Sequence, residues 1–185
     1  MDTITLKKKD VIEIYTKSNK EDKKLLEAIF GEDLFNTPIQ ERVKTFEDAC
    51  NELGEEHDFV KAYRNWETNG LNNQPDIESY LKLRIITAAL NEGWEPQFTE
   101  GEWRYFPYFT LYTQEEFDEM DEEIKNCVVS RSSRYEGADG RVACVDARFS
   151  QSNKYTSSGS RLALRSYKLA EYAGKQFLDI YVDFV

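Results

Sequence analysis

The sequence predicts an α+β fold in which a helical N-terminal half packs on a small antiparallel sheet with a C-terminal helix. Apolar residues recur at helical spacing through most of the chain before residue 93. An aromatic-rich segment over residues 94–113 favours strand structure, and helical spacing returns over residues 167–184. We expect residues 1–66 to form a helical part and residues 76–185 an α+β core, together in one compact domain.

Several helices are predicted in the first half of the chain. The first lies within residues 18–31, with Ser or Asn as its cap and Gly as its end. The second begins with a Thr-Pro pair, places five apolar residues on one face and continues over residues 37–54. A short helix over residues 55–66 precedes a loop rich in Asn and Gly over residues 67–75. The strongest helix, residues 77–92, carries apolar side chains over more than half its circumference and should be buried.

The second half alternates between strand and helix signals. Pro107 indicates that the aromatic segment is an edge strand or contains a bulge. Thr113 and Glu116 form a capping box for an acidic helix that continues to Asn126. The carboxylates of this helix are interpreted as the solvent-exposed face of an amphipathic helix. Shorter strands are expected over residues 127–130, 141–149 and 160–165.

The net charge of −11 is unevenly distributed along the chain. Residues 130–168 contain six Arg and two Lys against three acidic residues, a local balance of +5, so the other residues carry −16. A protein that binds polyanions usually has the opposite overall balance. An acidic body repels nucleic acid in general, but it is compatible with a local anion site.

Several kinds of site are disfavoured by the sequence. The single histidine, His57, is expected to be an exposed side chain, and it leaves no site that needs two or more histidines. The three cysteines, Cys50, Cys127 and Cys144, lack C-x-x-C spacing, which argues against a zinc site and against a disulfide framework. No P-loop and no dinucleotide-binding glycine motif occurs. We therefore expect no cofactor, no metal and no enzyme activity.

The N-terminal residues contain no apolar run of signal-peptide length. No segment approaches the roughly 20 apolar residues of a membrane span. We expect a cytoplasmic protein with free thiols and no membrane partner.

One segment is a candidate for ligand binding, because its cations are mostly arginines and its polar residues are mostly serines. Arginine presents a planar fork that suits phosphate or carboxylate groups. Strict alternation along strands would place Arg141 and Arg148 on opposite faces, and Arg161 and Arg165 on one face. The candidate ligand-binding residues are Arg131, Arg134, Arg141, Arg148, Arg161, Arg165 and Ser160, with Trp103, Tyr105 and Tyr108 available to stack on a ligand.

The alternative interpretation is that these arginines balance charge inside the molecule. The acidic segments 41–56 and 113–126 offer many carboxylates for internal ion pairs. The sequence leaves both interpretations open.

The segments "RVKTFEDACNELG", "YLKLRIITAALNEGW", "YFPYFTLYT" and "GSRLALRSYKLAEYAGKQFLDIYVDF" resemble a recurrent group of small proteins from gut Bacteroidales and their phages. The match spans most of the chain. The resemblance implies a phage or mobile-element setting, and it supplies no catalytic residues.

Together these observations predict a non-enzymatic phage or mobile-element accessory protein that binds an anionic ligand, a nucleotide or an oligonucleotide, to counter a host defence. The alternative is a protein–protein interaction module or virion accessory module that uses the acidic helices or the aromatic strand. Expected partners are an anionic small molecule or short nucleic acid, a host protein or a second copy of the chain, in the cytoplasm of a bacterial host.

Overall fold

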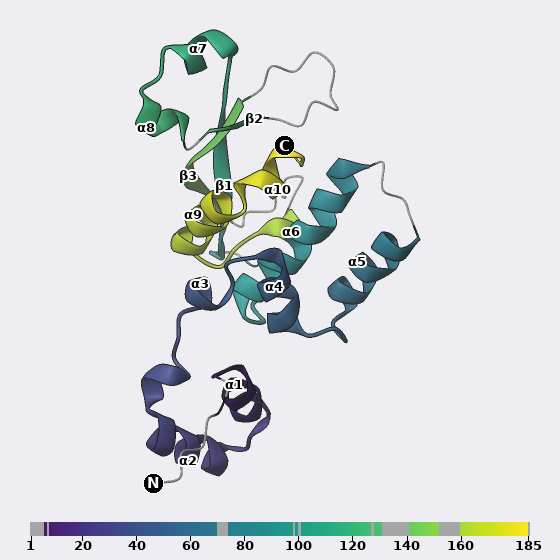
Figure 1. Ribbon diagram of the computed structural model, residues 1–185, viewed down its shortest axis with the longest axis vertical. Helices are drawn as coiled ribbons and strands as arrows, with labels where there is room; N and C mark the ends of the chain where they lie inside the picture. Colours follow the sequence, from purple (N-terminus) through teal and green to yellow (C-terminus); the bar gives the residue numbers. More distant parts are fainter. Residues whose placement is uncertain are drawn as a thin grey trace. The chain divides into compact units, whose positions relative to one another are not determined.

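A computed structural model of the 185-residue chain describes residues 6, 8–69, 74–97, 99, 101–126, 128–130, 141–151 and 160–184. At residues 8, 9, 130, 141–151 and 160 it describes the backbone alone. Helices and strands occur together, so the predicted α+β class is confirmed (Figure 1). The chain divides into two compact units, residues 1–41 and residues 42–185.

The boundary between these units differs from the boundary that the sequence suggests over residues 67–75. Helices α4 (Phe46–Leu53) and α5 (Asp58–Thr68) both contact α6 (Pro75–Asn91) within the second unit. The Asn- and Gly-rich segment therefore lies between two helices of the same unit. Packing of α5 on α6, which local composition does not reveal, accounts for the difference.

The first unit contains α1 (Lys8–Lys17), α2 (Lys20–Phe30) and the 3₁₀ turn η1 (Glu32–Leu34). Asn19 caps α2, because its side-chain oxygen accepts hydrogen bonds from two backbone N–H groups of the first turn. Helix α1 contacts α2, yet no residue of α2 is buried. This small unit buries little of its apolar surface.

The helix expected over residues 37–54 is interrupted, so that prediction is wrong. Helix α3 (Ile39–Arg42) is one turn long, and α4 begins only after Thr45. The Asp48 N–H donates to the Thr45 hydroxyl (3.1 Å), and the Thr45 N–H donates to the Asp48 carboxylate (2.9 Å). This reciprocal capping box starts a new helix and thereby ends the old one.

Helix α6 is the buried centre of the second unit, as predicted. Helices α4, α5, α9 (Tyr167–Gln176) and α10 (Leu178–Val182) all contact it. Its fully buried apolar side chains, each at most 1% exposed, are Leu83, Ile85, Ile86, Ala89 and Leu90. Among the residues described, no helix has the length and apolarity needed to cross a membrane.

Three strands, β1 (Trp103–Tyr112), β2 (Val129–Ser130) and β3 (Arg141–Gln151), pair antiparallel in the order β1-β3-β2. Pro107 lies in β1, at one edge of this sheet. The sheet packs mainly on α9, which contacts both β1 and β3, while α6 contacts α9 in turn (Figure 1). Helix α6 therefore lies against the helix that packs on the sheet, whereas the sequence predicted that the helical half packs on the sheet itself.

Two other predicted helices are each broken into shorter ones. The capping box of Thr113 and Glu116 is confirmed, but the acidic helix divides into α7 (Gln114–Asp118) and α8 (Glu122–Lys125). The final helix divides into α9 and α10 at Phe177, whose backbone angles (φ −116°, ψ 30°) leave the helical region. Apolar spacing continues across both breaks, so spacing alone does not locate them.

The strand expected over residues 160–165 is also wrong. Its first residues form the 3₁₀ turn η2 (Ser160–Leu162), and Leu164 makes only an isolated bridge to Tyr105, with N···O distances of 3.0 and 2.9 Å. The neighbouring backbone groups, on Ala163 and Arg165, bond instead to the side chain of Asn91. A side chain therefore occupies the place where a further strand would pair.

Candidate anion-binding pocket

The side chains of four of the predicted arginines are not among those that the structure describes. Arg131 and Arg134 lie outside the described residues. The backbones of Arg141 and Arg148 are in β3, opposite Tyr112 and Phe106 of β1. Between these two positions the backbone register shifts, at Tyr108 and Phe109 of β1. Ser160 is described as the first backbone position of η2.

Arg165 makes an internal ion pair. Its guanidinium pairs with the carboxylate of Glu92, and Arg42 pairs with the same carboxylate and with Glu52. For this one arginine an internal ion pair is present, as the charge-balance interpretation predicts, but its partner Glu92 lies outside the acidic segments 41–56 and 113–126 that were expected to supply the carboxylates.

The three predicted stacking residues all lie on β1 and are not grouped with Arg161. Trp103 is 43% exposed and Tyr108 is 41% exposed, while Tyr105 is half-buried beside its bridge to Leu164. None of the three lines the pocket in which Arg161 lies.

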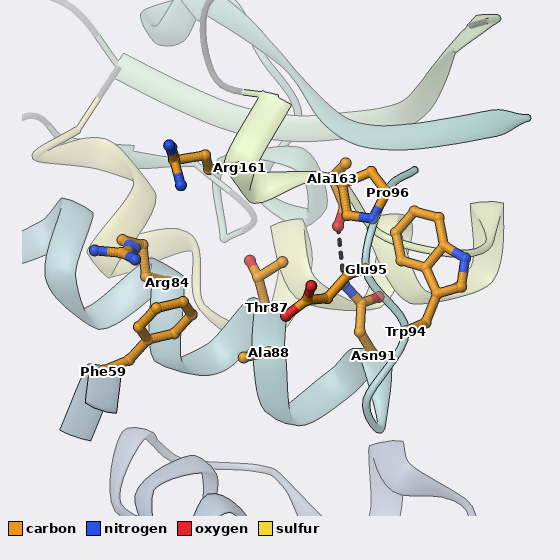
Figure 2. A pocket seen from close by; sticks show the side chains of 10 residues that line it. All are labelled: Phe59, Arg84, Thr87, Ala88, Asn91, Trp94, Glu95, Pro96, Arg161 and Ala163. Carbon is orange, nitrogen blue, oxygen red and sulfur yellow. Dashed lines mark hydrogen bonds between the residues drawn. The ribbon is translucent and has the colours of Figure 1, made fainter. Parts of the chain in front are cut away.

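That pocket is a cavity of about 300 Å³ beside the second half of α6 (Figure 2). Its walls come from α5, from α6, from the segment that follows α6, and from the chain around η2. The lining residues are Phe59, Arg84, Thr87, Ala88, Asn91, Trp94, Glu95, Pro96, Arg161 and Ala163.

Helix α6 supplies one wall through a mostly polar stripe in its second half. Arg84, Thr87, Ala88 and Asn91 are spaced by three or four residues, which places them on one face. The residues between them, such as Ile85 and Leu90, are buried in the core. This stripe was visible in the sequence, where polar residues interrupt the apolar run at helical spacing.

Arg84 is held in place by an aromatic ring rather than by a carboxylate. Its guanidinium carbon lies 3.9 Å from the centre of the Phe59 ring and 5.9 Å from that of Tyr80. Among the residues whose side chains are described, no carboxylate forms an ion pair with Arg84 or with the exposed Arg161. Figure 2 shows both guanidinium groups toward the same end of the pocket.

Thr87 brings a buried hydroxyl group to the pocket. The residue is only 3% exposed, and within the described part of the chain its Oγ1 has no hydrogen-bond partner. Buried hydroxyl groups in native proteins nearly always have a partner, whether protein, water or ligand. A ligand oxygen or a water molecule in the pocket would satisfy it.

Asn91 fixes the pocket wall that comes from the C-terminal part of the chain. Its Nδ2 donates to the Ala163 carbonyl (2.9 Å), and its Oδ1 accepts from the Arg165 N–H (3.0 Å) (Figure 2). Both ends of the amide are therefore used for structure, and η2 with Arg161 is held against α6.

The remaining wall follows the end of α6. Glu92 has a left-handed backbone (φ 49°, ψ 48°), which turns the chain and brings Trp94 and Glu95 to the pocket. In Figure 2 the Glu95 side chain points toward Thr87, and the Trp94 ring lies toward the opposite end from the arginines. Glu95 forms no ion pair with either arginine or with any other described cation.

The pocket thus combines two cations, one carboxylate, one unpartnered hydroxyl and two aromatic surfaces. Such a set can bind a small anion that carries a ring. Among the described residues, no group of three or more His, Cys, Asp and Glu side chains is placed to hold a metal ion. Sequence reasoning selected one residue of this pocket, Arg161. It missed the others because all of them except Ala163 lie outside the Arg-rich segment.

No protein-family model matches the sequence, and no curated protein or solved structure matches it.

Proposed function

We propose that the protein is a non-enzymatic binding protein that holds a small anionic ligand of the nucleotide class in the pocket beside α6. The observation that carries the proposal is that Arg84, Arg161 and Thr87 line the same pocket. Neither guanidinium group has a carboxylate partner among the described side chains, and the buried hydroxyl of Thr87 has no hydrogen-bond partner there.

Physical chemistry supports an anion rather than a neutral ligand. Two cations that face one cavity repel each other, and an anion between them replaces that repulsion with attraction. Guanidinium groups bind phosphate through paired N–H donors. Arg84 already stacks on Phe59, so its direction is fixed before a ligand arrives.

Pocket size supports one nucleotide rather than an oligonucleotide. Small-molecule sites in proteins span roughly 300–1,000 Å³, and this cavity of about 300 Å³ is at the lower limit. The overall charge of −11 also disfavours a long polyanion, whose other phosphates would meet an acidic surface.

As the biological setting we propose a phage or mobile element, with the protein acting in the cytoplasm of its bacterial host. The support is the resemblance of four sequence segments to small proteins of gut Bacteroidales and their phages. In that setting, a protein that sequesters a nucleotide would deprive a host defence of its signal. Transcript and protein levels through an infection or induction cycle test the setting: the proposal requires expression with the element's other genes.

Thermal unfolding with added ligands tests the binding function. A ligand that binds only the folded protein stabilises it by RT ln(1 + [L]/Kd), about 2.7 kcal/mol at a hundredfold excess over Kd. We expect inorganic phosphate to raise the melting temperature slightly and nucleoside monophosphates to raise it more. Arg161→Gln should abolish the shift, and Lys168→Gln, which removes an exposed cation outside the pocket, should preserve it.

Arg84 is best replaced by Lys, which keeps the charge near Phe59 but lacks the planar fork. We expect Arg84→Lys to fold normally and to bind more weakly than the wild type. The absence of any shift with phosphate and nucleotides would contradict the proposed function.

A second candidate function, a protein–protein interaction module, is supported by exposed apolar side chains on β1. Trp103, Tyr108 and Leu111 are 43%, 41% and 59% exposed. Exposed aromatic residues are enriched at interfaces between proteins. If this strand carries the function, Leu111→Glu should abolish capture of a host protein and leave nucleotide-induced shifts unchanged, whereas Arg161→Gln should do the reverse.

A further inference from the structure

The pocket holds charges of both signs that do not pair with each other. Arg84 and Arg161 are cations, Glu95 is a carboxylate, and no ion pair joins Glu95 to either arginine. An unpaired carboxylate weakens the binding of a simple anion such as phosphate. The exposed carboxylate of Glu95 favours binding where the ligand presents hydrogen-bond donors at some distance from its negative group.

Among the pocket side chains, Glu95 is best suited to accept hydrogen bonds from the edge of a nucleobase. The Asn91 side chain is buried and already bonds to the Ala163 carbonyl and the Arg165 N–H. Thr87 can donate or accept, so its hydroxyl adapts to either kind of group. The carboxylate of Glu95 accepts hydrogen bonds through two neighbouring oxygens and donates none.

Two neighbouring acceptors match one nucleobase edge better than the others. Guanine carries two donors side by side, N1–H and the 2-amino group. Adenine and cytosine place an acceptor nitrogen beside their amino group, and uracil places a carbonyl on each side of its N3–H. Against a carboxylate, each of these three edges brings at least one acceptor toward an acceptor, which costs binding free energy.

Resting on the proposed function, we infer that the ligand is a guanine mononucleotide. Its phosphate lies between Arg84 and Arg161, and its N1–H and 2-amino groups donate to Glu95. Trp94 borders the pocket beyond Glu95 and offers the ring an apolar surface (Figure 2). The assignment makes the 2-amino group a determinant of affinity.

Isothermal titration of the full chain with GMP, IMP, AMP and UMP tests this assignment. IMP keeps the N1–H and lacks only the 2-amino group, so it is the matched ligand control. We expect GMP to bind about tenfold more tightly than IMP, because one hydrogen bond to a charged acceptor is lost. AMP and UMP should bind more weakly than IMP.

Glu95→Gln tests the residue itself. The glutamine amide replaces one acceptor oxygen with a donor, so the preference for GMP over IMP should fall to less than about twofold. Binding of ribose 5-phosphate, which lacks a base, should persist. Glu119→Gln, a change at an exposed glutamate outside the pocket, should leave the preference intact. Equal melting temperatures would show that Glu95→Gln folds like the wild type.

The outcomes separate the two proposals. Equal affinity for all four nucleotides, a preference for AMP, or a GMP preference that survives Glu95→Gln would overturn the guanine assignment and leave the binding function in place. If neither ribose 5-phosphate nor any nucleotide binds the wild-type protein, the binding function fails and the guanine assignment fails with it.

Discussion

The side-chain nitrogen of Asn91 donates a 2.9 Å hydrogen bond to the carbonyl oxygen of Ala163, across 72 positions of sequence. The same side chain accepts from the Arg165 N–H. One buried amide, 3% exposed, therefore joins the end of α6 to the chain around η2, and both segments line the pocket.

Asn91→Ala should destabilise the protein and weaken ligand binding together. The substitution leaves a carbonyl and an N–H without partners, and each unsatisfied buried group costs ~1–3 kcal/mol. Urea unfolding followed by circular dichroism measures the loss. Asn126→Ala, at an exposed asparagine, serves as the control and should stay within ~0.5 kcal/mol of the wild type. Equal stability of the two variants would contradict the structural role of Asn91.

His57 has a structural role that its sequence context does not suggest. It is the N-cap of α5: its Nδ1 accepts the Phe59 N–H at 3.2 Å, and the two rings meet edge to face with centroids 5.0 Å apart. We expect His57→Ala to cost ~0.5–2 kcal/mol, the usual loss when a capping side chain is removed. His57→Asn, which restores a capping acceptor, should recover most of that loss in the same urea experiment. Full stability of His57→Ala would mean that the cap contributes nothing.

Cys50 makes stability depend on pH in alkaline solution. Burial, followed by the nearby charge of Glu47, raises the pKa of its thiol from 9.0 to about 11. Above pH 9 the unfolded chain loses this proton while the folded chain keeps it, so the folded state loses stability as pH rises from 9 toward 11.

The difference in unfolding free energy between the wild type and Cys50→Ala isolates this effect, since other groups titrate in both proteins. We expect the wild type to lose its advantage above pH 9 at a slope of up to about 1.4 kcal/mol per pH unit. A difference that stays constant between pH 8 and pH 10.5 would contradict the shift.

Glu92 combines an unfavourable backbone with two ion pairs. Its left-handed conformation costs a non-glycine residue ~1–2 kcal/mol, and its carboxylate pairs with Arg42 and Arg165. Glu92→Gln and Glu92→Gly both remove the ion pairs, but only glycine also removes the backbone cost. We therefore expect the Gly variant to be more stable than the Gln variant by ~1 kcal/mol, after the larger entropy of glycine in the unfolded chain is deducted. The opposite order in thermal unfolding would contradict this account of the turn.

Local signals predicted what local interactions determine. The apolar periodicity of α6, a cap at Ser18 or Asn19, and the capping box of Thr113 and Glu116 each involve residues close in sequence. All three are confirmed, with Asn19 as the cap. The capping box of Thr45 and Asp48 was equally local and was overlooked, because apolar residues at helical spacing on both sides favoured one continuous helix.

The pocket could be predicted only in part. Its polar stripe on α6 follows from sequence spacing, but Arg161 reaches that stripe through the contacts of Asn91 with a segment far along the chain. Pairing over such a distance depends on the whole fold and leaves no periodic trace. For the same reason, the ion pair of Arg165 with Glu92 could not be separated in advance from a ligand-binding role.

The bridge between Tyr105 and Leu164 has a consequence for how the protein is made. Leu164 is completely buried, and its neighbour Ala163 bonds to Asn91 at the end of α6. Because Ala163 follows Asn91 by 72 positions, helix α6 leaves the ribosome well before the segment around Leu164 does. At typical elongation rates of ~5–20 residues per second, Ala163 is added roughly 4–14 s after Asn91. During that interval the face of α6 that contacts η2, α9 and α10 lacks its partners. The nascent chain completes the pocket wall that contains Arg161 and Ala163 only after this segment has been synthesised.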